Sequence, residues 1–335
     1  MKPAASLPAR VFLLLCGGGF HSGAALARSL CVSRSAVWKA VGTLRELGLA
    51  VHAVRSRGYR LAVPVAPLEP VALLQALPAP LRARVRNLEV HWCIDSTNAE
   101  LLRRTELPAG QAEVLLAEYQ SAGRGRRGRS WLAPPGGAIC LSVGWSFAQL
   151  PRDVGSLGLA IGVCALRALI PHLPAGTGAP QLKWPNDLVA GGRKLGGILI
   201  DLRAESGGPG LAVVGIGINA ALGAQLQRQV AATGTEPTDL AGLGVDPRAR
   251  ARLAAGLIES IVAGLAQFER EGLSGFIEEW RRADALEGRP VRVLVTEPPV
   301  RGIACGIDAQ GALLVQTAKG LKRFISGEVS VRAEP

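Results

Sequence analysis

The sequence contains few of the residues that build metal sites and disulfide frameworks. Its 335 residues include four histidines, which lie far apart and match no metal-ligand spacing. We therefore expect neither a zinc site nor a histidine-based catalytic triad, and no metal site made by the protein alone. There is no C-x-x-C pair, and we predict free thiols, most of them buried, in a reducing compartment. The six cysteines are Cys16, Cys31, Cys93, Cys140, Cys164 and Cys305.

Long hydrophobic runs are also lacking. Lys2 and Arg10 precede a short apolar run at residues 11–17, but the run is shorter than a signal peptide requires, and Leu15 is too large for the cleavage position. This run is predicted to be a buried first helix. No other stretch approaches the roughly 20 apolar residues of a membrane span. We expect a cytoplasmic protein with no membrane partner.

Positive charge is in excess, and it is unevenly distributed. The net charge is +12, while residues 1–65 alone carry nine basic side chains against one acidic side chain, Glu46, for a net charge of +8. The chain length and the hydrophobic fraction of 48% are enough for two or three domains. The first of these domains is therefore predicted to have a polyanionic partner.

The first domain is predicted to be a winged helix-turn-helix. Residues 22–30 predict a short helix, and a second helix follows the capping residue Ser33. Strands predicted at 51–54 and 59–63 flank a basic turn and complete the pattern. The second helix carries an apolar stripe of Val37, Ala40, Val41, Leu44 and Leu47. The residues left facing outward are Arg34, Ser35, Trp38, Lys39 and Thr43.

DNA is the partner that this domain favours. Any three-helix bundle would show an apolar stripe, but the local charge and the basic wing favour nucleic-acid binding. The predicted DNA-contacting residues are Arg34, Ser35, Trp38 and Lys39 on the helix and Arg55 and Arg57 on the wing.

The rest of the chain divides into a linker and two further domains. Three prolines mark the linker, and a short helix is predicted from Pro70 to Leu77. Apolar strands then mix with helices, which predicts an α/β domain, and short strands after Gly288 predict a small β-barrel. The predicted strands of the α/β domain are 88–94, 114–119, 138–147, 195–202 and 211–218, and its longer helices are 154–170 and 247–267. The barrel strands are predicted at 291–295, 300–307, 312–316, 322–325 and 329–331. The predicted domains are 1–65, 66–85 as the linker, 86–285 and 286–335.

The most unusual segment is the glycine-arginine loop, residues 123–131, in which four arginines alternate with three glycines. It matches G-x-G-x-x-G by letter, but prolines and glycines at 134–137 stand where a dinucleotide-binding fold needs a helix. Glycines let the backbone approach a ligand, and guanidinium groups bind phosphate or carboxylate oxygens through forked hydrogen bonds. Composition alone does not choose between an anion-binding loop on the one hand and a solvated basic loop or a second nucleic-acid contact on the other.

A second candidate site is the segment Lys183-Trp184-Pro185-Asn186-Asp187. Only six of the 38 basic residues are lysines, and two of them, Lys183 and Lys194, bracket this segment. A compact ammonium group is therefore indicated at these positions, although a lone lysine between apolar residues usually extends to solvent. Asn186 and Asp187 either begin a turn or supply oxygen atoms to a magnesium ion.

Two weaker motifs accompany these segments. Asp95-Ser96-Thr97-Asn98 is able to cap a helix that begins near Ala99. Gly215 and Gly217 occur at the end of a buried strand, just before Asn219, where close backbone packing is the simplest explanation.

In this order, the motifs resemble the biotin-protein ligase family, and the winged N-terminal domain resembles its bifunctional ligase-repressor type. The resemblance covers nearly the whole chain. Its most specific marks are the glycine-arginine loop and the segment 183–187. The supporting marks are residues 34–47 with the wing, 95–98, 118–120, 194–199, 215–219, 306–313 and 327–330. Residues 220–237 correspond poorly, so no contacts to the adenine base are assigned.

The resemblance implies a fold and a reaction. The fold is a multidomain α/β arrangement of a winged helix-turn-helix, a central mixed α/β ligase domain of class II synthetase-like type, and an SH3-like C-terminal β-barrel. In the reaction, the carboxylate of biotin attacks the α-phosphate of ATP and releases pyrophosphate, and an acceptor lysine then attacks the acyl-adenylate. Mg²⁺ is implied together with ATP.

The resemblance also implies roles for individual residues and partners. Lys183 and Arg126 are the implied catalytic residues. Biotin and the adenylate are implied to contact Ser96, Thr97, Asn98, Gln120, Arg124, Gly125, Arg126 and Lys183. The candidates for binding ATP or Mg²⁺ are Asn186, Asp187 and Asn219. The implied partners are the biotin carboxyl carrier protein of acetyl-CoA carboxylase, operator DNA, and a second copy of the chain in a ligand-induced homodimer.

Two other functions compete with this interpretation. A lipoate-protein ligase would share the core fold and the acyl-adenylate chemistry, but the glycine-arginine loop argues against it. A transcription factor that only senses a ligand would keep the N-terminal domain without ligase activity, yet the ligase motifs are complete here.

Overall fold

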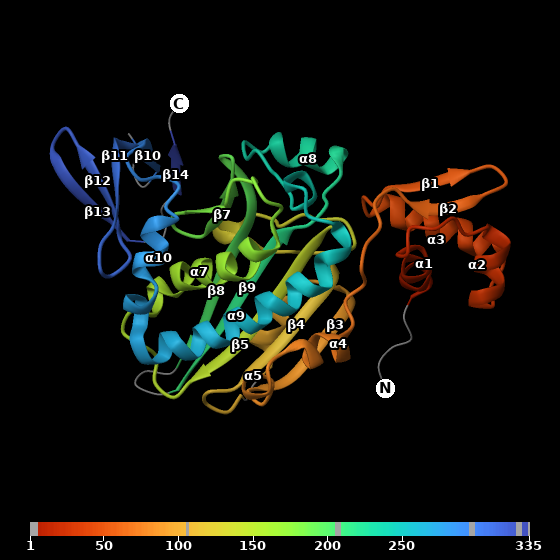
Figure 1. Ribbon diagram of the computed structural model, residues 1–335, viewed down its shortest axis with the longest axis horizontal. Helices are drawn as coiled ribbons and strands as arrows, with labels where there is room; N and C mark the ends of the chain where they lie inside the picture. Colours follow the sequence, from red (N-terminus) through yellow and green to blue (C-terminus); the bar gives the residue numbers. More distant parts are fainter. Residues whose placement is uncertain (1–5, 105–106, 205–208, 295–298, 326–329, 334–335) are drawn as a thin grey trace.

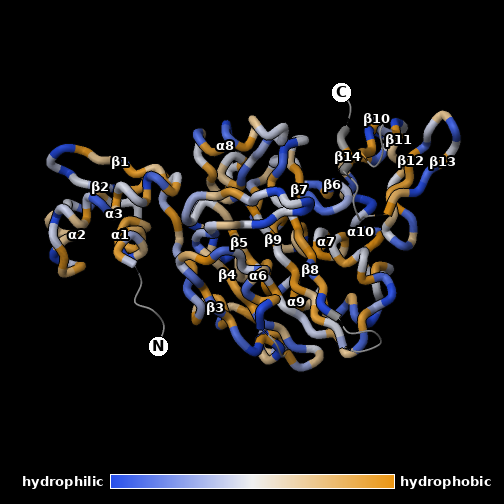
Figure 2. Tube along the Cα trace, turned by 180° about the vertical axis from the view of Figure 1, so that it is seen from behind, coloured by the Kyte–Doolittle hydropathy of each residue, from blue (hydrophilic) through white to orange (hydrophobic). Residues whose placement is uncertain are grey.

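The structure is a computed structural model that describes residues 6–104, 107–204, 209–294, 299–325 and 330–333. Figure 1 shows three regions in a row: a small helical N-terminal region with a hairpin, a large sheet covered by helices, and a small sheet at the opposite end. Figure 2 shows that hydrophobic stretches are concentrated along the strands and helices of the central region.

The N-terminal region is a helix-turn-helix followed by a wing. Ser22 and Ser33 cap its second and third helices, because their side chains accept hydrogen bonds from the backbone N–H groups of Ala25 and Ala36. Four residues of the predicted apolar stripe, Val37, Ala40, Val41 and Leu44, are buried in a core cluster of the N-terminal region, while Leu47 follows the end of the third helix and is only partly buried. The elements are α1 (Leu7–Leu15), α2 (Gly23–Leu30), α3 (Arg34–Glu46), β1 (Val51–Val54) and β2 (Gly58–Leu61).

The central region is built on a seven-stranded sheet in the order β3-β4-β5-β9-β8-β7-β6. β3 and β4 are parallel, and the other neighbours are antiparallel. The predicted strands of this domain are confirmed with small shifts at their ends. The strands are β3 (Val85–Ile94), β4 (Ala112–Gln120), β5 (Ala138–Phe147), β6 (Gln181–Lys183), β7 (Asp187–Ala190), β8 (Arg193–Ala204) and β9 (Gly210–Asn219).

Helices cover both faces of this sheet unequally. α7 (Leu157–Leu169) and α9 (Arg250–Glu271) pack on one face, and the short α6 (Thr97–Arg103) packs on the other. The remaining helices are α4 (Pro70–Ala76), α5 (Ala79–Arg82), α8 (Ala224–Ala231) and α10 (Ile277–Arg282). Short 3₁₀ turns occur at η1 (Arg126–Gly128), η2 (Val154–Ser156), η3 (Ile170–His172), η4 (Ala241–Leu243), η5 (Pro247–Ala249) and η6 (Gly272–Gly275).

Among the described residues, two helical stretches are long and apolar enough to cross a membrane by length and composition alone, Val154–His172 and Pro247–Gly275. This differs from the sequence-based expectation that no segment reaches this length. Both stretches contain the helices that pack on the central sheet, and most of their side chains are buried there. Their apolar character is therefore explained by the core of the central region.

A buried ion pair holds the segment between the N-terminal and central regions. Arg250 Nη1 lies 2.7 Å from Glu118 Oε2, and the two side chains are only 1% and 5% exposed. Arg250 Nη1 also donates to the carbonyl of Ala66, and the N–H of Leu68 donates to Glu118 Oε1. Much of the segment 66–85 is thus packed on the central region, with α4 and α5 lying against α9.

The C-terminal sheet has the strand order β13-β12-β11-β10-β14, and no pairing of β13 with β14 is found among the described residues. Its core side chains, including Val291 and Val293, belong to the same cluster as the core of the central sheet. Trp184 Nε1 donates to the carbonyl of Gly311 at 3.0 Å, and this hydrogen bond also joins the central region to the C-terminal region. The strands are β10 (Pro290–Leu294), β11 (Val300–Ile307), β12 (Leu313–Thr317), β13 (Gly320–Phe324) and β14 (Ser330–Ala333). The motif positions 327–329 and the predicted strand positions 295 and 329 lie outside the described residues.

The cysteines agree only partly with the sequence-based prediction. All six are free thiols, and Cys16, Cys140 and Cys164 are buried as predicted. Cys31, Cys93 and Cys305 are exposed, so the prediction that most are buried is wrong. Cys93 and Cys305 lie on β3 and β11, where alternate side chains point out of the sheet and an apolar neighbourhood in sequence does not ensure burial.

Candidate active site and DNA-binding surface

A cavity of about 610 Å³ opens on the face of the central sheet that carries α6. All the predicted ligand-site residues from Ser96 to Asn219 line this one cavity, although they come from segments far apart in the sequence. Six basic side chains line it: Arg124, Arg126, Arg127, Arg129, Lys183 and Lys194. Asp187 is the single acidic side chain among the described lining residues. The cavity therefore suits a ligand with several negative charges.

The glycine-arginine loop folds back over the cavity as a short hairpin. The N–H of Gly125 donates to the carbonyl of Arg129 at 2.7 Å, and the N–H of Trp131 donates to the carbonyl of Gly123 at 2.8 Å. η1 lies at its tip, where Arg127 has a positive φ of 58°. These bonds fix the loop backbone, so that its arginine side chains can be presented to a ligand.

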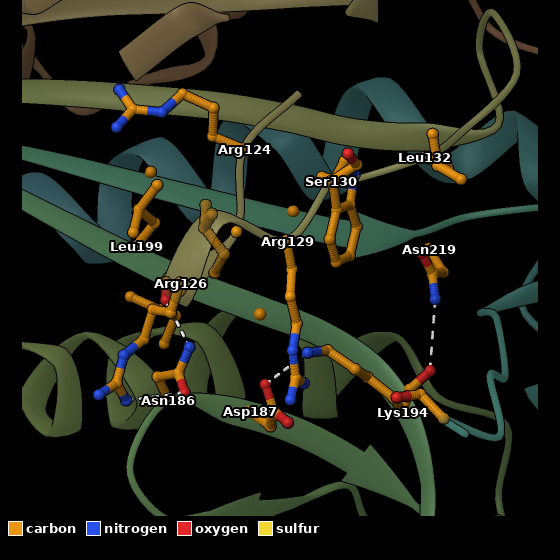
Figure 3. Close-up of a pocket in the computed structure, with 18 of the residues that line it drawn as sticks. Arg124, Arg126, Arg129, Ser130, Leu132, Asn186, Asp187, Lys194, Leu199 and Asn219 are labelled. Atoms are coloured by element: carbon orange, nitrogen blue, oxygen red, sulfur yellow. Dashed lines mark hydrogen bonds and ion pairs between the residues drawn. The ribbon is translucent and has the colours of Figure 1, made fainter. Parts of the chain in front are cut away.

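Arg126 is the loop arginine that is tied to a second predicted site residue. Its Nη1 donates to Asn186 Oδ1 at 3.2 Å. Burial lowers the pKa of Arg126, Asp187 acts in the opposite direction, and Arg127 lowers it further. Figure 3 shows Arg126, Arg129 and Lys194 extending toward the region of Asn186 and Asp187. The loop and the segment 183–187 therefore form one cationic end of the cavity.

The segment 183–187 joins β6 to β7 and places its polar side chains against β8. Asp187 Oδ1 lies 2.6 Å from Lys194 Nζ, and Asn186 Nδ2 donates to the carbonyl of Ile198 at 2.8 Å. Lys194, for which the sequence predicts no role at the ligand, is thus a lining residue held by the predicted Asp187. Its rarity in an arginine-rich chain is the signal that points to it.

The other end of the cavity is polar and uncharged. The N–H of Thr97 donates to Gln120 Oε1 at 2.8 Å, and Thr97, Asn98 and Ser96 are all almost fully buried. Ser96 also caps α6, as predicted, by accepting from the N–H of Ala99. Ser142, on β5, was not predicted, and its hydroxyl oxygen lies 2.6 Å from both Thr97 Oγ1 and Asn98 Oδ1.

The two glycines of β9 make room for site residues. A Cβ on Gly215 would lie 2.2 Å from Asn98 Oδ1, and a Cβ on Gly217 would lie 2.6 Å from the ring of Trp131. Both distances are too short for any side chain to fit without displacing its neighbour. The sequence pattern attributes these glycines to close packing, and the structure shows that the packed groups belong to the site.

Asn219 lies at the end of β9 and is nearly fully buried. Its Nδ2 donates to the carbonyls of Thr238 at 2.9 Å and Lys194 at 3.3 Å. The side chain therefore joins β8 to the segment near Thr238 at the edge of the cavity, while its role toward ATP or Mg²⁺ stays a prediction.

The predicted DNA-contacting residues are exposed on the N-terminal region. Trp38 is 65% exposed, and its neighbours Arg34, Ser35 and Lys39 on α3 are exposed too. On the wing, Arg55 is exposed, and the guanidinium of Arg57 lies 4.2 Å above the ring of Phe20. The wing is fixed by two backbone hydrogen bonds between His21 and Tyr59.

Comparison with known proteins relates these features to a family. Three family models match, described as HTH domain (residues 11–60), Biotin/lipoate A/B protein ligase family (90–219) and Biotin protein ligase C terminal domain (288–332). The chain is 38% identical over 329 residues to the bifunctional ligase/repressor BirA of Escherichia coli, and the alignment covers 98% of each chain. The chain belongs to the biotin protein ligase family, and its three matches together have the composition of the bifunctional ligase-repressor type.

Further relatives support the same assignment. A biotin–[acetyl-CoA-carboxylase] ligase of Mycobacterium tuberculosis is 39% identical over 247 residues, which cover 73% of this chain and 88% of the relative. The solved structure of a biotin protein ligase from Aquifex aeolicus in complex with biotin and ATP is 27% identical, with a TM-score of 0.61. The alignment covers 74% of this chain and 100% of the Aquifex aeolicus chain.

Proposed function

We propose that this protein is an ATP-dependent ligase that forms biotinoyl-5′-AMP and transfers biotin to a lysine of a biotin carboxyl carrier protein. The observation that carries the proposal is a cavity that has an uncharged polar end and a cationic end, in a chain similar to a bifunctional ligase/repressor along its length. Biotin has a neutral polar ring and an acidic chain, and ATP is polyanionic. The two ends of the cavity match these chemical requirements.

The proposed mechanism assigns the two ends to different tasks. Ser96, Thr97, Asn98 and Gln120 hold the ring, while Arg124, Gly125, Arg126 and Lys183 surround the carboxylate and the α-phosphate. A carboxylate oxygen forms a bond to the α-phosphorus as the bond to pyrophosphate breaks. Fixed ammonium and guanidinium groups stabilise the charge that develops, by about 3 kcal/mol for a well-placed donor.

The second step needs no nucleophile from this protein. The unprotonated amine of the acceptor lysine attacks the acyl carbon, AMP leaves, and the nitrogen loses its extra proton as the amide forms. The glycine-arginine loop covers the cavity in this proposal and keeps water from the mixed anhydride. Arg126, which is tied to Asn186, holds the anion during this interval.

We propose that Mg²⁺ accompanies ATP at Asp187. The cavity offers one carboxylate and the amide oxygen of Asn186, while six cations lie around them. Magnesium is commonly bound by one or two carboxylates together with substrate phosphates, so this donor set fits an ion brought with ATP. Bound there, Mg²⁺ would neutralise phosphate charge. Asn219 lies near this end and is proposed as a further ATP contact.

We propose a domain division of 1–65, 66–85, 86–285 and 286–335, with DNA binding in the first part. The central domain is proposed to be class II synthetase-like, and the C-terminal sheet to close into an SH3-like barrel. The separate core of the N-terminal region supports the first boundary. Because the segment 66–85 is packed on the central region, a truncated chain that begins at Ala66 should keep more ligase activity than one that begins at Ala83.

The ligase proposal is tested by ATP–pyrophosphate exchange with biotin and lipoate side by side. We expect exchange with biotin alone, followed by transfer of radiolabelled biotin to a carrier domain. Exchange with lipoate in place of biotin would establish the lipoate-ligase alternative. Absence of exchange with either acid would leave the ligand-sensing transcription factor as the remaining interpretation.

We propose a second function as a biotin-responsive repressor, because α3 and the wing of a helix-turn-helix domain both expose basic side chains, and α3 also exposes Trp38. A single domain of this size gives limited specificity, so a ligand-induced homodimer on two operator half-sites is part of the proposal. Because operator DNA and the carrier protein are the proposed partners, the activity is proposed to be cytoplasmic.

The repressor proposal is tested by salt titration of binding to a duplex from the region upstream of the protein's own gene. Replacing Arg55 and Arg57 with Gln should weaken binding to specific and scrambled duplexes alike, and should lower the log–log salt slope by about 1 for each lost phosphate contact. The control replaces two exposed arginines of the central region, Arg152 and Arg248, with Gln. No salt-sensitive binding by the wild type with biotin and ATP would end the repressor proposal and leave the ligase proposal standing.

A further inference from the structure

Behind the uncharged end of the cavity, a chain of polar side chains runs away from the ligand site. Thr97 and Asn98 both line the cavity, and Ser142 lies behind them and meets both side chains. Asn98 Nδ2 then donates to Asp201 Oδ2 at 2.9 Å and to the carbonyl of Leu199 at 3.3 Å. Ser142 and Asp201 are absent from the cavity lining, so they can affect a ligand only through the residues in front of them.

The two acceptors on β8 fix the orientation of the Asn98 amide. Asp201 Oδ2 and the carbonyl of Leu199 both require an N–H donor, so Asn98 Nδ2 faces them and Asn98 Oδ1 faces Ser142. The amide cannot easily move aside, because Asn98 lies directly over Gly215. Ser142 is itself fully buried. The hydrogen bond to Asp201 therefore helps to ensure that Ser142 faces the oxygen of the Asn98 amide and not its nitrogen.

The direction of the hydrogen bonds follows from counting protons. Ser142 Oγ lies 2.6 Å from two oxygen atoms, and a hydroxyl has a single proton. Asn98 Oδ1 has no proton to give, so Ser142 must donate to Asn98. The contact between Ser142 and Thr97 then requires the Thr97 proton. Gln120 Oε1 is a second acceptor for this proton, but it lies farther from Thr97 Oγ1, at 3.1 Å. This is the arrangement that places a proton in both short contacts.

We propose that Asp201 is a positioning residue that makes Thr97 Oγ1 a hydrogen-bond acceptor toward the cavity. With its proton committed to Ser142, Thr97 presents only lone pairs to a ligand. The site then selects a ligand ring that offers an N–H group, such as the cyclic urea of biotin. This inference rests on the proposed ligase function and assigns a specificity role to a residue outside the cavity lining.

The test is calorimetric titration of Asp201→Leu with biotin and, separately, with ATP. Asp201→Leu removes the shorter of the two bonds from Asn98 Nδ2 and leaves the one to the Leu199 carbonyl at 3.3 Å, so the amide should turn more readily and the direction of the hydrogen bonds should be able to reverse. We expect biotin to bind at least 10-fold more weakly, ATP affinity to change less than twofold, and kcat at saturating biotin to stay within threefold of wild type. Asp201→Asn keeps an acceptor oxygen and should restore biotin affinity to within about threefold of wild type.

A double-mutant cycle separates this role from a purely structural one. Ser142→Ala interrupts the same chain, so Asp201→Leu combined with Ser142→Ala should lose little more biotin affinity than the weaker-binding single variant. Additive losses, equal loss of biotin and ATP affinity, or wild-type biotin affinity in Asp201→Leu would each overturn the role of Asp201. If the wild type itself fails to bind biotin, the proposed function fails as well, and that result is distinct from a failure confined to the variant.

Discussion

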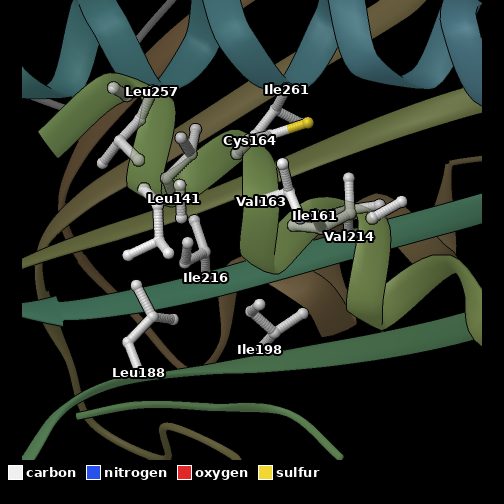
Figure 4. Packing of buried hydrophobic residues seen from close by; sticks show 14 of the residues in the cluster. Leu141, Ile161, Val163, Cys164, Leu188, Ile198, Val214, Ile216, Leu257 and Ile261 are labelled. Atoms are coloured by element: carbon white, nitrogen blue, oxygen red, sulfur yellow. The ribbon is translucent and has the colours of Figure 1, made fainter. Parts of the chain in front are cut away.

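The two faces of the central sheet are made from the same strands and serve opposite purposes. On one face, Ile139, Leu141 and Val143 of β5 pack with α7 and α9 in the main core. Figure 4 shows Leu257 and Ile261 of α9 above this layer of apolar side chains. On the other face, the intervening Cys140 and Ser142 lie at the ligand cavity or directly behind it. Adjacent residues of β5 thus serve different purposes: one faces the core, and the next faces the ligand cavity.

The difference between the faces shows why polar residues are tolerated inside this sheet. Each apolar side chain contributes about 1.5–3 kcal/mol through its burial on the helix-covered face. A buried hydroxyl such as that of Ser142 contributes only if its hydrogen bonds are made, and it meets two oxygen atoms at 2.6 Å. The apolar face therefore supplies most of the stability, and the other face can carry polar groups that bind a ligand.

The strongest way to break this comparison is Ile139→Ala, on the apolar face. The side chain is fully buried, so the free energy of unfolding should fall by about 2–5 kcal/mol. Biotin affinity should stay within twofold in the folded protein. Urea denaturation and calorimetry measure the two quantities. Ser142→Ala is the control from the opposite face, with a smaller loss of stability and a larger loss of biotin affinity; the reverse result would contradict the division.

The next largest effect is expected for Lys183→Ala, at the cationic end of the cavity. Removing an ammonium group beside the developing phosphate charge should slow single-turnover formation of biotinoyl-adenylate by about 100-fold. Lys319→Ala removes an exposed lysine of the C-terminal sheet and serves as the control. A rate within threefold of wild type for Lys183→Ala would contradict the assigned role.

Asp284 offers a contrast with Ser142, whose hydroxyl meets two partners. It is a buried carboxyl beside β6, and one of its oxygens lacks a partner among the described residues. Burial raises its pKa from 3.8 to about 6. The unfolded chain loses this proton first as the pH rises, so this group's contribution to stability is present below about pH 4 and is lost as the pH passes 6. Relative to Asp284→Asn, the wild type should lose about 2 kcal/mol of unfolding free energy between pH 4 and pH 7. Parallel curves for the two proteins would refute this.

The smallest expected effect is that of Gly217→Ala, on the ligand face. The new methyl group would lie 2.6 Å from the Trp131 ring, which must move. We expect biotin affinity to fall about 10-fold, equivalent to about 1.4 kcal/mol, with a smaller change in unfolding temperature. Gly144→Ala on the neighbouring strand is the control, because its Cβ would meet only ordinary contacts at 3.8 Å or more. Equal effects of the two substitutions would show that Trp131 does not matter for binding.

Much of this molecule was predictable because its sequence carries local signals. Alternating or continuous apolar runs predicted the strands of the central sheet, and Ser33 with the stripe after it predicted α3. The scarcity of lysine and the density of glycine and arginine singled out the segments that the structure brings to one cavity. These features depend on residues close in sequence, and their physical meaning does not require a known tertiary contact.

The sequence by itself determined the elements, the charge of the N-terminal domain and the residue types of the ligand site. Only the tertiary structure decided which polar groups meet. Ser142 lies within an apolar strand, where no sequence pattern marks it as a site residue. Asp201 lies 103 positions from the Asn98 that it orients. The partner of Glu118 is Arg250, on a helix that begins far along the chain. A hydrogen bond or buried ion pair depends on distance and direction in space, and neither is encoded in the local pattern of either residue.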